Sequence, residues 1–450
     1  MKKKMVKIFI VLITFSLLLG LGASIRSARA QEPHVIRVDT TEDLRDFAHN
    51  GVCSAGSANS GPCSLRAAIY EGARYYTGNV VIELPPGVYK LTLTEPIYEG
   101  EPEDYYGDLD FPALATAPSV GVQIKGTGDW DNPSIIDANF IDRVMQIGEN
   151  QKVHLTNLVL KNGLTKKIGP SQEGLAGGGL HVFGAEVKLT HVRLTNNEAR
   201  GEDGFVSDGG AIYASYSDLT MAYCELDHNR SDIRSTLHAD DSNDPIQIYS
   251  SSIHHNTINE GYSAHIDAGN GLVMTNSTMS DNEGGKYYII GGQLSLIQNS
   301  TLISKGNVGI IWNRSVLQLW FNILQNIPIP GVESGLICTM QESNEPSLGG
   351  NIFSDNSCRP GSNDRVIGYS GMRLGPLGDY GGPTPTIPLF LSSPAINYGI
   401  NDCSVADGYP LLTDQRLLDR NDGKCDTGSF ELQPDETPGG VLFLPLTLRN

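Results

Sequence analysis

The 450-residue sequence has little charge and few aromatic residues, and most of its charge is of one sign. Charged residues make up 18% and aromatic residues 7% of the chain, whereas Gly occurs 51 times. So little charge with so much Gly excludes a coiled coil or helical bundle, and the lack of a three-residue Gly period excludes collagen. Only 32 Lys and Arg stand against 51 Asp and Glu, which disfavours nucleic acid and anionic lipid as partners.

Long apolar runs are absent beyond the N-terminus. Residues 1–30 have the pattern of a secretory signal peptide: a basic start, an apolar run at 8–21, and Ala28-Arg29-Ala30 as a small-x-small cleavage pattern. This run is shorter than the ~20 residues of a membrane-spanning helix, so we expect cleavage before Gln31 rather than an uncleaved anchor. Cleavage removes six basic residues, leaves a net charge of −25, and implies a secreted or extracellular cell-surface protein.

Cysteine is scarce, with seven in the chain, and no two form a C-x-x-C pair, which disfavours a zinc site. In an oxidising compartment we expect three local disulfides, although spacing alone does not fix the connectivity. The natural pairs are Cys53 with Cys63, Cys338 with Cys358, and Cys403 with Cys425. Cys224 is left over, and we interpret it as a small buried residue rather than a reactive thiol.

What the chain does contain is an internal repeat, from about residue 153 to 327. One apolar column recurs at steps of 34, 32, 27, 26, 23 and 22 residues, at Leu160, Leu194, Leu226, Ile253, Met279, Leu302 and Leu324. The alternation within each unit has period two, which indicates strands, and the repeat length is typical of a solenoid. We predict an all-β, single-stranded parallel β-helix. A leucine-rich repeat would need a helix or L-x-x-L-x-L spacing in each unit, and neither is evident.

Two further columns accompany this apolar column. Two residues earlier come mostly small or polar residues, namely Leu158, Val192, Cys224, Ser251, Ser277, Ser300 and Asn322. Three residues later come Asn197, Asn229, Asn256 and Asn282. Polar side chains fit a tightly wound interior only if they hydrogen-bond along a stack, and Asn tolerates left-handed backbone. We predict hydrogen-bonded ladders between coils, with these Asn residues at the turns.

The open ends of a β-helix need covers, because each end is an exposed sheet edge. The strongest helix signal is at residues 64–74, with Ser64 as N-cap, and it predicts an N-terminal cap. The organisation that we expect is a signal peptide at 1–30, a cap with the first strands at 31–95, β-helix coils at 96–330, a C-terminal region at 331–433, and a tail at 434–450.

Four features of the sequence carry a resemblance to known families. PCSLRAAIYEG (62–72) followed by VIELPPGVYKLTL (81–93) resembles the CSLREA-type N-terminal region of secreted right-handed parallel β-helix proteins, with Ala67 where that family usually has Glu. The repeats resemble the pectate-lyase-like superfamily. Residues 374–399 and 414–432 resemble the choice-of-anchor Q domain, with Leu417-Leu418 where Gly is usual after DQR. The final VLFLPLTLRN resembles the tail of exported bacterial proteins. The resemblance implies a right-handed β-helix and an exported bacterial setting, but no reaction.

A second strand in each unit projects a ring or imidazole, at His181, Tyr213, His238, His265, Tyr288 and Trp312. In register these would form one outer row about 5 Å apart per coil. Our leading interpretation is a non-catalytic exported or cell-surface protein that contacts a polysaccharide or cell-surface glycan, with His181, Tyr213, Tyr288 and Trp312 as binding residues. The plainer alternative is that these rings only decorate an exposed sheet.

Catalysis is the runner-up hypothesis. Asp240 and Asp267 follow His238 and His265 by two residues, and a His beside a carboxylate can act as an acid or base. These four would be the catalytic residues of a polysaccharide lyase or glycoside hydrolase. Such an enzyme should show convergent carboxylates on adjacent coils with a basic group beside them, whereas a binding rod should show rings and scattered polar groups.

A Ca²⁺ site is a weaker hypothesis. Asp240, Asp241 and Asp244 place oxygens at intervals in one loop, but no bidentate Glu follows, so an ordinary polar loop is the favoured interpretation. DRNDGKCD (419–426) is likewise interpreted as a disulfide-tied turn. No other cofactor is indicated, because the sequence contains no P-loop, dinucleotide fingerprint or nucleophile elbow. The sequence carries no signal for the oligomeric state.

Overall fold

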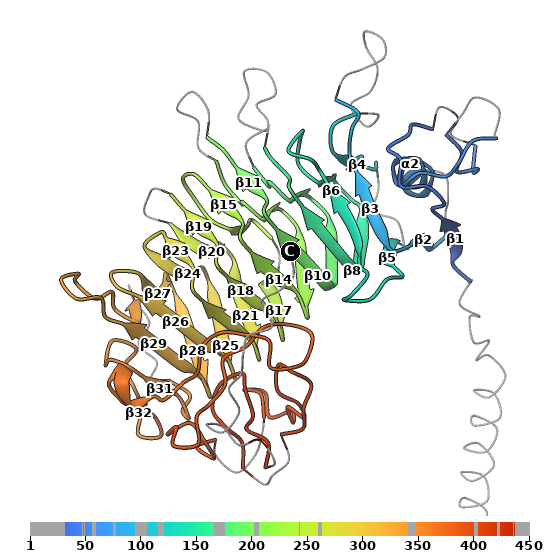
Figure 1. Cartoon of the computed structure of the whole chain (residues 1–450). Helices are drawn as coiled ribbons and strands as arrows, with labels where there is room; N and C mark the ends of the chain where they lie inside the picture. The colour runs from blue at the N-terminus through green and yellow to red at the C-terminus, as the bar shows by residue number, and fades with distance from the viewer. Residues whose placement is uncertain are drawn as a thin grey trace, which may run out of the picture.

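The computed structural model describes residues 32–436, except residues 47, 49, 56–59, 75–77, 95–105, 116–120, 166–175, 202–206, 243, 260–262, 341–346, 400–403, 421–423 and 435. The expected signal peptide and the apolar C-terminal tail therefore lie outside the described residues. Figure 1 shows one elongated solenoid, which starts beside helix α2 (Leu65–Arg74) and ends near β32 (Arg365–Val366). Among the described residues, no helix is long and apolar enough to cross a membrane.

Sheet A is built from two stacks of parallel strands that meet at a corner of each coil. The first stack consists of β1 (His34–Arg37), β2 (Val80–Leu84), β5 (Val122–Gly126), β8 (Lys152–Lys161), β10 (Glu186–Thr195), β13 (Asp218–Ala222), β17 (Ile246–Tyr249), β21 (Gly271–Thr275), β25 (Leu294–Gln298) and β28 (Val316–Trp320). The second stack consists of β3 (Gly87–Lys90), β6 (Ser134–Asp137), the later halves of β8 and β10, β14 (Glu225–Asp227), β18 (Ser252–His254), β22 (Thr278–Ser280), β26 (Thr301–Lys305), β29 (Ile323–Ile327), β31 (Ile352–Phe353) and β32.

Two more parallel sheets lie on the remaining sides of the solenoid. Sheet B forms the third side and contains β4 (Leu109–Phe111), β7 (Met145–Ile147), β9 (Leu180–Phe183), β12 (Ile212–Ser215), β16 (Leu237–Asp240), β20 (Ala264–Ala268), β24 (Tyr287–Gly291), β27 (Gly309–Asn313) and β30 (Cys338–Met340). The short sheet C contains β11 (Glu198–Ala199), β15 (Arg230–Ser231), β19 (Thr257–Ile258) and β23 (Glu283–Gly284). The predicted all-β parallel solenoid is therefore confirmed.

The apolar column predicted from the repeat forms the centre of the core. Its members pair in register from coil to coil, for example Leu226 with Ile253 and Met279 with Leu302, and they are fully buried. The repeat fixes this register because a slip by one residue would turn every apolar side chain outward.

Both predicted ladders are present. The backbone N–H of Asn229 donates to Oδ1 of Asn256 at 2.9 Å, and that of Asn256 donates to Asn282 at 3.1 Å. In the other column, the N–H groups of Cys224, Ser251 and Ser277 each donate to the Ser hydroxyl of the next coil, at 3.0–3.1 Å. These side chains are buried, so the ladders satisfy polar groups that would otherwise be costly to bury.

The predicted turn geometry needs one correction. The ladder Asn residues do not themselves have left-handed backbone. Left-handed φ angles of 45–58° occur instead in the column one residue earlier and in a second column at the corner of sheet A. These columns are Asn162, Asn196, His228, His255 and Asp281, and Asn157, His191, Tyr223, Ser250, Asn276, Asn299 and Phe321. The ladder Asn therefore supplies hydrogen bonds rather than the bend.

The helix predicted at residues 64–74 is present as α2. Helix α2 packs against β2 and β4, and the Ser64 hydroxyl accepts the Ala67 N–H at 3.1 Å as an N-cap. The disulfide Cys53–Cys63 lies directly before this helix.

At the other end, the described parts of the segment 374–433 fold back along sheet A, drawn in orange and red beside β25 and β31 in Figure 1. Gln415 accepts a hydrogen bond from Thr278 at 2.6 Å, and Arg420 donates to Asn276 at 2.9 Å. The second disulfide, Cys338–Cys358, joins β30 to the chain after β31. Cys403, of the third expected pair, lies outside the described residues.

Candidate functional site

The outer face of sheet B carries one continuous file of side chains. In register across its nine strands come Asp110, Gln146, His181, Tyr213, His238, Asp267, Ile290, Trp312 and Thr339. At the usual spacing of about 4.8 Å between strands, this outer file is roughly 40 Å long. Four residues of the predicted row, His181, Tyr213, His238 and Trp312, belong to it.

The other two predicted members of the row, His265 and Tyr288, point inward. Both are 0% exposed, and their rings meet edge to face with 5.7 Å between centroids. His265 Nδ1 lies 3.1 Å from the Thr236 hydroxyl, and the Tyr288 hydroxyl accepts the N–H of Asn282 at the end of the Asn ladder. Burial lowers the pKa of His265 to about 3, so it is neutral at ordinary pH and has no access to a substrate.

A bulge at the entry to sheet B explains this inversion. Two successive N–H groups donate to one carbonyl: Ala211 and Ile212 both donate to Thr236, and Ile310 and Ile311 both donate to Ile337. Such a bulge lets two consecutive side chains face the core, which breaks the two-residue alternation. Asp267, rather than His265, therefore pairs with His238.

The first three rings of the outer file stack on one another. His181 and Tyr213 are parallel within 3° at 5.5 Å, and Tyr213 and His238 are parallel within 6° at 5.0 Å. Because the rings stack face to face, each one covers a face of its neighbour. A ligand approaching this part of the sheet would therefore contact mainly the ring edges. This part of the file offers hydrogen-bonding edges rather than the stacking surface that we predicted for a sugar. Burial lowers the pKa of His181 to about 3, so its ring is neutral.

His238 lies between two carboxylates. Its Nδ1 is 3.0 Å from Oδ2 of Asp208, and its Nε2 is 3.1 Å from Oδ2 of Asp240. Arg234 Nη1 lies 3.7 Å from the same Asp208 oxygen. Asp267 stands beside His238 on the next coil. Three carboxylates thus gather around one imidazole with a basic group beside them, and we call these five residues the His238 cluster.

The His238 cluster contains groups whose pKa values are shifted in different directions by burial and by neighbouring charges. Burial alone would lower the pKa of His238, but Asp240, Asp208 and Asp267 together raise it above the usual value. Burial opposes ionisation of Asp240, yet His238 and Ser215 lower its pKa. Burial raises the pKa of Asp267, against the opposing charges of His238 and Arg314. Two neighbouring carboxylates are therefore shifted in opposite directions.

Of the four residues predicted to be catalytic, His238, Asp240 and Asp267 come together and His265 does not. Asp208 was missed by the sequence reasoning. Its Oδ1 is fixed by the N–H groups of Gly209 and Ser235 and by the Ser235 hydroxyl at 2.5 Å, which leaves Oδ2 to face His238. The feature of the sequence that could have identified Asp208 is its position directly before the Gly209-Gly210 pair, which leads into β12.

The predicted Ca²⁺ ligands do not converge. Asp240 ends β16 and pairs with His238, Asp241 is exposed at a left-handed turn, and Asp244 lies beyond it near Asp218. In the described part of the chain, no group of three His, Cys, Asp or Glu side chains is arranged to hold a metal ion. Cys224 is buried within its ladder column, as predicted, and burial raises the pKa of its thiol to about 12.

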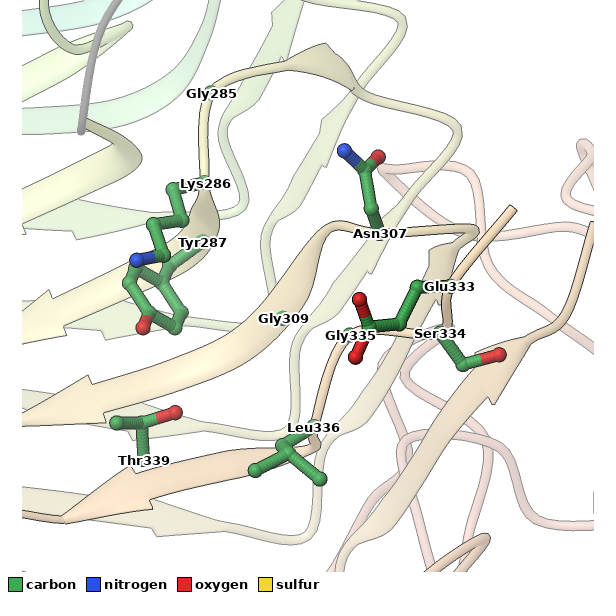
Figure 2. Close-up of a pocket in the computed structure, with 10 residues that line it drawn as sticks. All are labelled: Gly285, Lys286, Tyr287, Asn307, Gly309, Glu333, Ser334, Gly335, Leu336 and Thr339. Atoms are coloured by element: carbon green, nitrogen blue, oxygen red, sulfur yellow. The ribbon is translucent and has the colours of Figure 1, made fainter.

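The outer file runs into a cleft of about 570 Å³ at its C-terminal end. Thr339 is the last member of the file and also lines the cleft, whose other lining residues are Gly285, Lys286, Tyr287, Asn307, Gly309, Glu333, Ser334, Gly335 and Leu336. The Tyr287 ring stacks on Trp312 at 5.9 Å. Figure 2 shows Lys286 and Tyr287 on one side of this cleft, and Glu333 and Ser334 across it.

Comparison with known proteins supports the fold alone. A family model described as a right handed beta helix region matches residues 120–302, from just before β5 into β26. This similarity supports a right-handed winding of the solenoid, which the resemblance in the sequence also implied. No curated protein matches the chain.

Proposed function

We propose that this protein is exported and binds a polysaccharide or cell-surface glycan along the outer file of sheet B. The observation that carries the proposal is the continuity of that file, which presents polar ring edges, carboxylates and an indole before it opens into the cleft at Thr339. Sugars combine many hydroxyls with apolar C–H faces, and ligand sites commonly pair a few placed polar groups with aromatic surface.

Trp312 is the residue on which binding should depend most. It is half-buried, it stacks on Tyr287, and the Arg314 guanidinium lies 5.3 Å from its ring centroid. It joins the polar part of the file to the cleft. Aromatic side chains in such positions contribute much of the binding energy of an interface.

The test is retention of the purified full chain on a panel of neutral and acidic polysaccharides. We expect the Trp312→Ala variant to bind at least about tenfold more weakly than the wild type. Trp130→Ala is the matched control, because Trp130 is exposed between β5 and β6, away from sheet B. Failure of the wild type to bind any member, or equal losses in both variants, would contradict the proposal.

Cleavage of the bound glycan is a second candidate, and the His238 cluster favours it. In a glycoside hydrolase one carboxylic acid protonates the leaving oxygen while a second carboxylate activates water or attacks. Carboxylates with pKa values moved in opposite directions are suited to these two roles. Asp267, with its raised pKa, would be the acid, and Asp240, with its lowered pKa, the base.

The same samples distinguish binding from cleavage. New reducing ends that disappear in Asp267→Asn, while binding persists, would establish hydrolysis at this cluster. Ultraviolet absorbance from an unsaturated product, measured with and without Ca²⁺, would instead indicate a lyase. Binding with neither product would leave the glycan-binding proposal alone.

A further inference from the structure

The middle of the outer file and its C-terminal end differ in charge. Around His238 lie Asp208, Asp240 and Asp267, with Arg234 as the nearby cation. The C-terminal end instead has Arg314 against Trp312 and Lys286 against Tyr287, at 5.3 and 5.6 Å from the ring centroids. A ligand lying along the C-terminal half of the file would therefore meet mostly acidic groups near His238 and the basic groups Arg314 and Lys286 toward the cleft.

Three of the residues that line the cleft beside Lys286 are glycines. Gly285, Gly309 and Gly335 occupy this corner on successive coils. A Cβ at Gly309 would lie 2.7 Å from the Tyr287 ring, and one at Gly335 would lie 2.6 Å from the Val308 carbonyl carbon. The coils approach so closely at these two positions that a larger residue would force a neighbouring coil to shift.

The walls of the cleft offer both charge and hydrogen bonds. Lys286 is exposed beside the Tyr287 ring, and Asn307, Ser334 and Thr339 supply an amide and two hydroxyls. Glu333 is the acidic group of the lining and lies across the cleft from Lys286 in Figure 2. A carboxylate or sulfate on the Lys286 side could gain a charge-assisted hydrogen bond, with hydroxyl contacts around it.

We propose that the cleft receives one anionic group, a carboxylate or a sulfate, at the end of an otherwise neutral glycan, and that Lys286 binds it. This inference rests on the proposed glycan-binding function and adds a direction: the neutral part of the chain lies over the His238 cluster and the charged end lies in the cleft. Electrostatic complementarity of this kind sets register and specificity. A glycan charged along its whole length binds less well, because its other anions would face Asp240 and Asp267.

The experiment is an oligosaccharide array with three classes of probe: neutral chains, the same chains oxidised to a carboxylate or sulfated at one end, and uniformly charged polyuronates. The expected result is about tenfold stronger binding to end-charged than to neutral chains, as for a charge-assisted contact. Lys286→Gln should remove this preference, so that end-charged chains bind no more tightly than neutral chains do. The preference should also shrink as salt is raised, because the contact is partly exposed. The carboxylate and sulfate arms distinguish the two anions.

Lys188→Gln is the matched control, because Lys188 is an exposed lysine on β10 of sheet A that pairs with Glu186. It should leave the preference intact. Strongest binding to uniform polyuronates, or a preference that survives Lys286→Gln, would overturn this inference while the glycan-binding proposal stands. Absence of binding to every probe class would overturn both.

Discussion

Two outer faces of the same solenoid differ in what lies on them. On the second stack of sheet A, small hydroxyl side chains face the segment 374–433, and Thr278 and Thr301 hydrogen-bond to Gln415 and Ser429. On sheet B the outward positions carry rings and carboxylates, many of them half-exposed. Both faces have the same backbone pairing and the same inward apolar column. The comparison teaches that coil geometry fixes the inside, whereas the outward residues decide whether a face is covered by the chain itself or left for a ligand.

The packing of the segment 374–433 on sheet A can be tested most directly at Arg420. Its guanidinium is fully buried, lies 3.0 Å from the Glu431 carboxylate, and donates to Asn276 on sheet A. Arg420→Met would remove the buried guanidinium that faces the Glu431 carboxylate, so we expect a loss of about 3–5 kcal/mol in the free energy of unfolding.

Urea unfolding and limited proteolysis would measure this effect. Cleavage should begin within 374–433, while glycan binding on sheet B persists under conditions where the coils remain folded. A loss below about 1 kcal/mol, within the range of exposed ion pairs, would contradict the view that this network holds the segment on sheet A.

The contribution of the Asn ladder in the shared interior to stability can be tested at Asn256. This side chain accepts from Asn229 and donates to the Leu226 carbonyl at 2.8 Å, all within the core. Asn256→Leu would leave those buried groups unsatisfied, and we expect a cost of about 2–4 kcal/mol in unfolding free energy. Exposed Asn132→Ala is the control and should change it by less than about 0.5 kcal/mol. Similar values for the two variants would mean that the ladder adds nothing to stability.

The sequence predicted the interior better than the outer face. The apolar column and both ladders repeat residue by residue, since each member must meet its counterpart on the next coil. The row on sheet B failed at His265 and Tyr288 because a bulge interrupts the two-residue alternation there. Pairs of consecutive apolar residues in this strand, such as Ile310-Ile311, were the sequence feature that could have indicated the bulge. Asp208 and the coverage of sheet A depend on contacts between distant segments, which a local pattern does not encode.

The bulge makes a testable contrast between inward and outward histidines. Burial holds the folded pKa of His265 at about 3, below the ordinary value of 6.5. Between these values the unfolded chain takes up a proton that the folded chain does not, so stability present above pH 6.5 is lost as the pH falls, at up to about 1.4 kcal/mol per pH unit. His265→Leu, which resembles Ile310 and Ile337 in the same column, should remove that loss. The stability of the wild type relative to this variant should therefore fall by up to about 3 kcal/mol between pH 7 and 4 in urea unfolding.

His238, on the outer face, should show the opposite sign and a smaller effect. Its pKa is raised because Asp240, Asp208 and Asp267 outweigh the effect of burial, and these opposing contributions partly cancel. A raised folded pKa stabilises the protein fully below the unfolded value, and this stabilisation is lost as the pH rises through the folded value. The wild type should therefore be most favoured over His238→Gln in mildly acidic solution and progressively less so in alkaline solution. Urea unfolding from pH 5.5 to 8.5 measures the difference, and imidazole NMR titration assigns it. If acidification instead lowered the relative stability at both histidines, His238 would be buried in the manner of His265, and the acidic cluster on sheet B would not exist as described.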